Sequence, residues 1–387
     1  MTGKVAIVAA AQTKYEERKD GADISEMVYE VVKQTLDETG LKFSEDGTGI
    51  DATVSCSQDL WDGRTISSTW CIDVAGGHLR PEEKVAGDGV SAVTYGALQV
   101  LSGHFDIVLV VAYCRESITQ GSLVEWMSID PIYHRMLGLD FCSGAALQAT
   151  RYMNKYNITC EQCAKEVVWS HRQAKNNPYA QTPKDLTVED VLSSPILASP
   201  IRVLDSKPVS DGAVAVILAN ENKARKLTNR PVWIKGFGTC YDAHFPGERD
   251  LAECDALILA AKQAYGMADI TDPLKQIDVA EISEQYSYQG LLWSEGLGFC
   301  RRGEGGKFID RLFAGQIEMA LNPSGGALVG NPVTVTGATR VAEATLQLMG
   351  QAGTRQVQGA GVALAHGMDG LCGQTHHVMI LETGSEK

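Results

Sequence analysis

Three polar side chains at the ends of short apolar stretches could carry out proton transfer. Ser283 and Glu284 directly follow the strand-like residues 277–282, and His366 ends the strand-like residues 361–366. An imidazole titrates near neutral pH, and a carboxyl or hydroxyl group beside it can accept or donate a proton. These residues suggest acid–base chemistry, and a solvated strand end is the alternative for Ser283 and Glu284.

Two cysteines could supply a nucleophile or an acid. Cys372 lies within the glycine-flanked residues 369–373 (Asp-Gly-Leu-Cys-Gly), shortly after His366, and Cys56 ends the strand-like residues 50–56. A thiol that is near an imidazole ionises more easily, as a nucleophilic cysteine must. The competing interpretation of Cys372 is a small, buried apolar side chain.

Asn331 could stabilise negative charge on a substrate oxygen. It follows Gly330 and precedes the helix-like residues 333–349. An amide at this position could donate a hydrogen bond to an oxyanion. The same position equally suits a helix N-cap.

A basic, glycine-rich segment could bind a phosphate group. The sequence Gly-Glu-Gly-Gly at residues 303–306 is flanked by Arg301, Arg302, Lys307 and Arg311. Backbone N–H groups of such a loop, together with arginine side chains, can form an anion site. A solvated surface loop is the alternative.

The sequence predicts no metal site. Cys160 and Cys163 have the spacing of half a zinc site, but they fall in the helix-like residues 158–176 and no second pair follows. His376 and His377 open an alternating strand, so we expect one imidazole to face inward and the other outward.

Composition excludes some classes of partner. The 387 residues include 34 Lys and Arg against 48 Asp and Glu, which gives a net charge of −14. An acidic surface argues against nucleic acid and anionic membrane as partners. No apolar run reaches the roughly 18 residues of a membrane span. Ten cysteines spread through a large chain without signal-peptide anatomy indicate a reduced, cytoplasmic protein.

The elements that must position these side chains occur twice in the same order. Each half reads strand, helix, short strand, buried helix and apolar strands, as expected for α/β halves with helix-covered mixed sheets. The predicted elements of the first half are 4–10, 25–40, 50–56, 90–102, 107–112 and 213–219, and those of the second are 232–238, 251–266, 277–282, 333–349, 361–366 and 378–381. Gly40 and Gly266 are predicted to end equivalent helices.

One segment has no counterpart in the second half. It runs from about residue 115 to about residue 210 and contains predicted helices at 143–155 and 160–176. A long insertion in one repeat commonly forms a lid or binding subdomain. Trp61, Trp70, Trp126, Tyr133 and Tyr179 lie in or near the first-half loops and could line an aromatic acyl pocket.

Together these features resemble the thiolase superfamily over essentially the whole chain. The motifs that carry the resemblance are Asn-Pro-Tyr-Ala at 177–180, Pro-Val-Ser-Asp-Gly-Ala at 208–213, Gly-Glu-Gly-Gly at 303–306, Asn-Pro-Ser-Gly-Gly at 322–326 and Ala-His-Gly at 365–367. The resemblance implies a duplicated, five-layered αβαβα fold with an inserted loop subdomain. The implied units are an N-terminal half (1–115 and 210–225), a CoA-lid subdomain (116–209) and a C-terminal half (226–387).

The resemblance also implies that coenzyme A is a substrate. We expect Ser324, Gly325, Gly326, Arg301 and Arg302 to contact it. The polar residues expected to be catalytic are His366, Asn331, Ser283, Glu284 and Cys372.

The sequence departs from the family where a thiolase has its nucleophile. Ala86 stands in the place of the family's cysteine, and Asn331 replaces a histidine that usually activates it. Alanine cannot carry an acyl group, so the usual two-step transfer through this position is excluded. The nucleophile could be Cys372, Cys56 or the thiolate of free CoA attacking the ketone directly.

Three functions remain open. The chain is most similar to the thiolase subunits of benzoylsuccinyl-CoA thiolases, which implies CoA-dependent cleavage of a β-ketoacyl-CoA, a homodimeric core and a small zinc-ribbon and OB-fold partner in a heterotetramer. A thiolase-like aldolase with Tyr286 or Glu284 as base is the second possibility. A catalytically silent subunit that binds acyl-CoA is the third.

Overall fold

The computed structural model describes residues 4–43, 49–330 and 332–384. Ten strands form one mixed sheet in the order β10-β9-β11-β12-β8-β1-β7-β4-β2-β3. Their bounds are β1 Val5–Gln12, β2 Ala52–Cys56, β3 Glu82–Val85, β4 Ile107–Arg115, β7 Asp211–Asn220, β8 Val232–Tyr241, β9 Val279–Glu281, β10 Ala320–Leu321, β11 Val362–Asp369 and β12 Thr375–Thr383. A separate two-stranded sheet pairs β5 (Ile196–Ala198) with β6 (Ile201–Arg202).

The strand order shows the duplication directly. Read outward from the centre, β1-β7-β4-β2-β3 and β8-β12-β11-β9-β10 are equivalent series. In each series the first two pairings are antiparallel and the last two are parallel. The halves meet where β1 pairs with β8 over only two residue pairs. The predicted repeat is therefore confirmed, with the two half-sheets joined into one.

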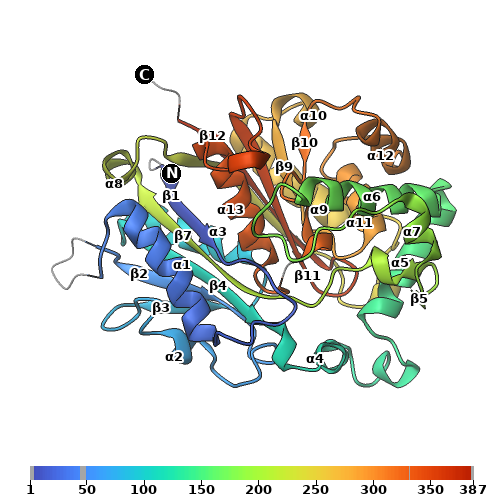
Figure 1. The fold of residues 1–387 in the computed structure, drawn as a ribbon, viewed down its shortest axis with the longest axis horizontal. Helices are drawn as coiled ribbons and strands as arrows, with labels where there is room; N and C mark the ends of the chain where they lie inside the picture. The colour runs from blue at the N-terminus through green and yellow to red at the C-terminus, as the bar shows by residue number, and fades with distance from the viewer. Residues whose placement is uncertain (1–3, 44–48, 331, 385–387) are drawn as a thin grey trace.

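The helices complete a five-layered arrangement. Helix α1 packs on β1, β4 and β7, and α9 packs on β8 and β12, so these two form the outer layers. Helices α3 and α13 pack against each other and against strands of both halves, which places them in the middle (Figure 1). The bounds are α1 Ile24–Thr39, α2 Ser68–Cys71, α3 Gly89–Leu101, α8 Glu221–Leu227, α9 Asp255–Ala268, α10 Pro273–Gln276, α11 Ser287–Gly296, α12 Gly305–Phe313 and α13 Thr336–Met349.

The insertion lies between β4 and β7, where the second half has only residues 370–374 between β11 and β12. It contains α4 (Gly121–Ser128), α5 (Phe141–Tyr156), α6 (Cys160–Ala174) and α7 (Val188–Ser193). Helix α6 packs against α11 and α12 of the C-terminal half, as the green segment in Figure 1 shows. The insertion therefore covers the end of the sheet where the strands of that half finish.

Two local predictions differ from the structure. Gly40 ends α1 in the left-handed conformation, as predicted, but Gly266 lies inside α9, which ends at Asp269 instead. Asp269 has a φ of 57°, a conformation that aspartate tolerates better than most residues. Gly305 and Gly306 are not in a loop but begin α12, and the N–H groups of Gly303 and Gly305 donate to the Glu295 carboxylate at 2.7 and 2.8 Å, which leaves less free backbone N–H for an anion than the sequence suggested.

None of the helices in the three described ranges combines the length and the apolar character that crossing a bilayer requires.

Candidate active site

A cavity of about 240 Å³ opens where the two halves meet the insertion. Its apolar wall includes Leu60, Trp61, Val124, Ile129, Leu139 and Phe141, and its polar wall includes Gln58, Glu125, Lys207, Gln285 and Asp369. Of the predicted aromatic set, only Trp61 lies on this wall. Trp70, Trp126 and Tyr133 are exposed, and Tyr179 packs partly buried against the core. The cavity is thus an apolar chamber with a few polar groups, as small-molecule sites usually are.

Ala86 directly follows β3, is exposed, and is next in sequence to a residue that lies near the polar wall of this cavity. An added Cβ on the next residue, Gly87, would lie 4.0 Å from Oδ2 of Asp369. Asp369 is the last residue of β11 and comes from the second half, whereas Ala86 comes from the first. The residue after the position of the missing nucleophile therefore lies near a carboxyl group of the other half.

Asp88 connects the two central helices immediately behind this position. Its Oδ1 accepts the N–H of Val90 at 2.8 Å, which caps α3, and its Oδ2 accepts the N–H of Gly337 at 3.1 Å, in the first turn of α13. A Cβ on Gly367 would lie 1.7 Å from Asp88 Oδ1, so glycine is required there. Burial, and to a lesser degree the charge of Asp369, raises the pKa of Asp88 to about 7.

His366 does not reach the cavity wall but forms an internal contact. Its Nε2 lies 3.0 Å from Nδ1 of His376, its Nδ1 accepts the N–H of Ser283 at 3.3 Å, and its carbonyl accepts the Ser283 hydroxyl at 2.8 Å. Burial lowers the pKa of His366 to about 3 and that of His376 well below its usual value. Both imidazoles are therefore neutral near pH 7. Their contact joins β11 to β12, and the hydrogen bonds of Ser283 join the residues after β9 to β11.

Glu284 is also fully buried. Its carboxylate accepts hydrogen bonds from the Asn322 amide at 3.0 Å and from the N–H of Ala327 at 2.9 Å. A Cβ on Gly326 would lie 2.0 Å from its Oε1. Burial raises its pKa to about 7. Glu284 therefore shapes the turn at 322–327 from inside.

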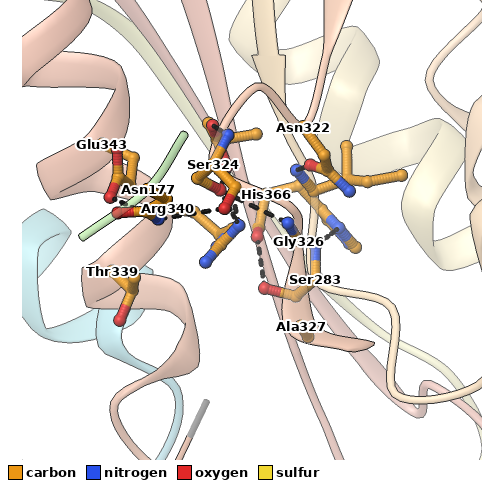
Figure 2. A network of polar contacts seen from close by, with 12 residues as sticks. Asn177, Ser283, Asn322, Ser324, Gly326, Ala327, Thr339, Arg340, Glu343 and His366 are labelled. Carbon is orange, nitrogen blue, oxygen red and sulfur yellow. Dashed lines mark hydrogen bonds and ion pairs between the residues drawn. The ribbon is translucent and has the colours of Figure 1, made fainter. Parts of the chain in front are cut away.

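Ser324 belongs to a buried ion-pair network that Figure 2 shows. Its hydroxyl donates to Glu281 at 2.6 Å, and Arg340 of α13 contacts the same carboxylate at 2.6 Å. Gly325 and Gly326, with φ of 102° and 70°, form the turn that allows this approach. The expectation that Ser324, Gly325 and Gly326 contact CoA finds no support in their positions, because all three are buried.

Both candidate nucleophilic thiols are buried. Cys372 is 6% exposed, and burial raises the pKa of its thiol to about 12. Cys56 is fully buried, its thiol lies 3.4 Å from the carbonyls of Gly87 and Thr334, and burial raises its pKa well above normal. Neither thiol has the environment that produces a reactive thiolate.

The remaining sequence candidates lie elsewhere. Asn331 falls outside the described residues. Arg302 forms ion pairs with Glu253 at 2.8 Å and Asp255 at 2.9 Å on the surface, and neither Arg301 nor Arg302 lines the cavity.

Neither candidate metal pair is arranged as a ligand set. Cys160 is exposed whereas Cys163 is buried. His376 and His377 lie on opposite faces of β12, but both are buried, so the expected outward-facing histidine is not found. His377 instead contacts the Thr239 hydroxyl at 3.0 Å. Within residues 4–43, 49–330 and 332–384, no group of three or more His, Cys, Asp or Glu could hold a metal.

Sequence reasoning missed the polar residues that do line the cavity. Glu125 lies on α4, and burial raises its pKa to about 7. Lys207 is ion-paired with Glu116 at 3.0 Å. Asp369 was noted only as a neighbour of Cys372. The signal that could have identified it was strand length. The predicted strand ends at residue 366, whereas β11 continues to Asp369 and so places that residue at the end of the sheet.

A second, open pocket of about 1,020 Å³ adjoins the first and shares His134, Leu139 and Pro246 with it. Its wall comes mainly from α5 and residues 246–251 and includes Arg151 and Arg249. Arg151 pairs with Asp250 at 2.9 Å, and Arg249 donates to the carbonyls of Leu371 and Gly373. Together the pockets have room for a large, elongated ligand.

Comparison with known proteins agrees with this architecture. Residues 239–383 match the model of the "Thiolase C-terminal domain-like" family. The acetyl-CoA acetyltransferase of Methanothermobacter thermautotrophicus is 34% identical over 378 residues, covering 95% of this chain and 97% of the relative. The chain belongs to the thiolase superfamily.

One further relative and one solved structure are also similar to this chain. The benzoylsuccinyl-CoA thiolase subunit BbsB of Thauera aromatica is 30% identical over 59% of this chain and 60% of the relative. A solved structure named "Ltp2-ChsH2(DUF35) aldolase" has a TM-score of 0.83 at 22% identity, covering 99% of this chain and 98% of the other. As a member of the thiolase superfamily, the chain is of the acyltransferase class, yet it has Ala86 where the resemblance places the nucleophile.

Proposed function

We propose that this chain is the catalytic core of an enzyme that cleaves a β-ketoacyl-CoA with CoA and forms no covalent acyl intermediate. The observation that carries the proposal is the cavity whose wall residue Asp369 lies near Gly87, together with the burial and raised pKa values of the two candidate thiols, Cys56 and Cys372. Because neither candidate thiol has an environment that favours a thiolate, the thiolate of free CoA attacks the ketone directly. The chain then binds both CoA esters, excludes water and moves one proton.

The proposed substrate is 2-benzoylsuccinyl-CoA, which CoA cleaves to benzoyl-CoA and succinyl-CoA in the last step of anaerobic toluene β-oxidation. Similarity to a subunit that is named for this substrate supports the choice. The cavity supports it as well, because Trp61 and Phe141 on its wall could pack against a phenyl ring. The adjoining larger pocket offers space for the pantetheine arm of CoA.

We also propose a partner subunit. One relative is named as a subunit, and the name of one structural neighbour includes a DUF35 component. A homodimeric core with a small zinc-ribbon and OB-fold partner would form a heterotetramer. The unpaired state of all ten cysteines agrees with the cytoplasm as its place of action.

Retro-aldol cleavage of a β-hydroxyacyl-CoA is the second candidate, because that reaction needs no nucleophile at position 86. Of its two proposed bases, Glu284 is fully buried, and Tyr286 is 8% exposed and stacked on Tyr288. The third candidate, a silent acyl-CoA-binding subunit, needs neither base.

Product analysis separates the three functions. Thiolysis consumes free CoA, retro-aldol cleavage releases an aldehyde or ketone without consuming it, and a silent subunit does neither. We expect the purified chain alone to be nearly inactive, and the chain with its partner to consume one CoA per cleavage with no acylated protein by mass spectrometry. Full activity of the isolated chain would contradict the partner, and an acylated cysteine would contradict direct attack.

A further inference from the structure

We propose that Asp369 is the acid–base residue of the cavity and takes up and returns the proton that carbon–carbon cleavage requires. This inference rests on the proposed function. It assigns to the carboxyl group of Asp369 the role that the sequence had offered to Ser283, Glu284 or His366.

The position of Asp369 separates it from those residues. Ser283, Glu284 and His366 are fully buried, whereas Asp369 is half-buried and lies on the cavity wall. Its Oδ2 is the side-chain atom nearest to a Cβ built on Gly87, next to Ala86. A carboxyl oxygen here could touch a substrate that occupies the cavity.

The hydrogen bonds of Asp369 orient it without neutralising it. Oδ1 accepts the N–H of Gly370 at 2.7 Å, and Oδ2 accepts the Gln58 amide at a longer 3.4 Å. Lys207 on the same wall is paired with Glu116 and so does not hold Asp369. Oδ2 is therefore the more available atom for exchanging a proton.

The surroundings favour a carboxyl group that can exist in both protonation states. Burial raises the pKa of Asp369. A general acid–base group is most effective when its pKa lies near the working pH. The titratable groups near Asp369 are Cys56 from β2, Asp88 from the start of α3, Glu125 from α4, Lys207, and His134 and His244 from the cavity rim.

The reaction balances with this single group. The Asp369 carboxylate takes the proton of the CoA thiol as sulfur forms a bond to the ketone carbon. When the bond between that carbon and the α-carbon breaks, its electron pair stays on the α-carbon as an enolate of the leaving acyl-CoA. Asp369 then returns the proton to the α-carbon, so no oxidant or further reactant is required.

The test uses the reverse proton transfer, which needs no cleavage. The chain with its partner is incubated with succinyl-CoA in D₂O, and deuterium at the α-carbon is measured by mass spectrometry. We expect Asp369→Asn to lower both deuterium uptake and cleavage by about 10²- to 10⁴-fold, the usual contribution of an acid–base group. Asp369→Glu should recover part of both rates. Asp37→Asn, the same change on an exposed face of α1, should leave them unchanged.

Each outcome decides the proposal. CoA binding measured by calorimetry confirms that the Asn variant is folded. If the folded Asp369→Asn variant loses deuterium exchange, the role of Asp369 is supported. This holds even if the wild type cleaves none of the acyl-CoAs tested, a result that would contradict only the proposed function. If Asp369→Asn exchanges and cleaves within about 3-fold of the wild-type rates, the role of Asp369 is overturned and the proposed function is not affected. A change of that size is far below the usual contribution of an acid–base group. A wild type with neither exchange nor cleavage overturns both.

Discussion

Replacing Asp88 by asparagine tests whether a buried carboxyl group joins the two central helices in its protonated form. Asp88 is 1% exposed and accepts one N–H from α3 and one from α13. Burial raises its pKa to about 7. The folded protein therefore holds this proton more tightly than the unfolded chain, and the free energy of unfolding should fall as pH rises from about 4 to about 7.

The size of the effect follows from the shift. A rise of about three pKa units corresponds to roughly 4 kcal/mol, of which about 2 to 3 kcal/mol should be lost between about pH 5 and about pH 8. Asparagine cannot ionise, so Asp88→Asn should lack this loss. It also presents an NH₂ group to one of the two backbone N–H donors, which should cost about 1 to 3 kcal/mol at every pH. The variant should be less stable than the wild type in acid and approach or exceed it in mild alkali.

Urea unfolding followed by tryptophan fluorescence at several pH values measures both effects. Asp88→Ser, which keeps an N-cap oxygen without an ionisable group, should flatten the pH dependence in the same way. Asp37→Asn should give a curve parallel to the wild type. A constant stability difference between wild type and both Asp88 variants across this range would refute the reasoning, because it would mean that Asp88 titrates normally in the folded protein.

The remaining predictions concern the buried thiols and a buried ion pair. Cys372→Ala and Cys56→Ala should each keep near-native turnover in an assay of CoA consumption, because the environment of neither thiol favours ionisation. A folded variant whose activity falls more than about 100-fold would instead indicate covalent catalysis. Arg355→Met should cost about 3 to 5 kcal/mol in urea unfolding, because it leaves the buried Glu343 carboxylate without the guanidinium 2.8 Å away. Adding Glu343→Met should recover much of that loss, and no recovery would mean that the arginine acts through packing alone.

The sequence was sufficient to predict the fold because the signal repeats. Hydrophobic periodicity occurs twice in the same order, and the equivalent series from β1 and from β8 follow it closely. The resemblance also indicated from sequence that alanine replaces the usual cysteine at position 86, and the type of residue there decides whether that position can carry an acyl group. Neither inference depends on the direction of any side chain.

The direction of side chains at the strand ends was decided only by the tertiary structure. The sequence predicted that the strand at 361–366 ends at His366, but β11 continues to Asp369 through pairing with β12. Because side chains alternate along a strand, residues 366 and 369 face opposite sides. His366 therefore turns inward to His376, and Asp369 reaches the cavity.

Long-range contacts also decided which polar groups are structural. Ser283 and Glu284 were candidates because polar residues at strand ends commonly meet a substrate, and Ser324 was a candidate because the resemblance implied a contact with CoA. Here each is satisfied by a group distant in sequence, such as His366 for Ser283 and Arg340 near Ser324. The sequence determined the fold and, through the resemblance, indicated that alanine replaces the usual thiolase cysteine, whereas the groups that face the cavity were fixed by strand length and by contacts between the halves.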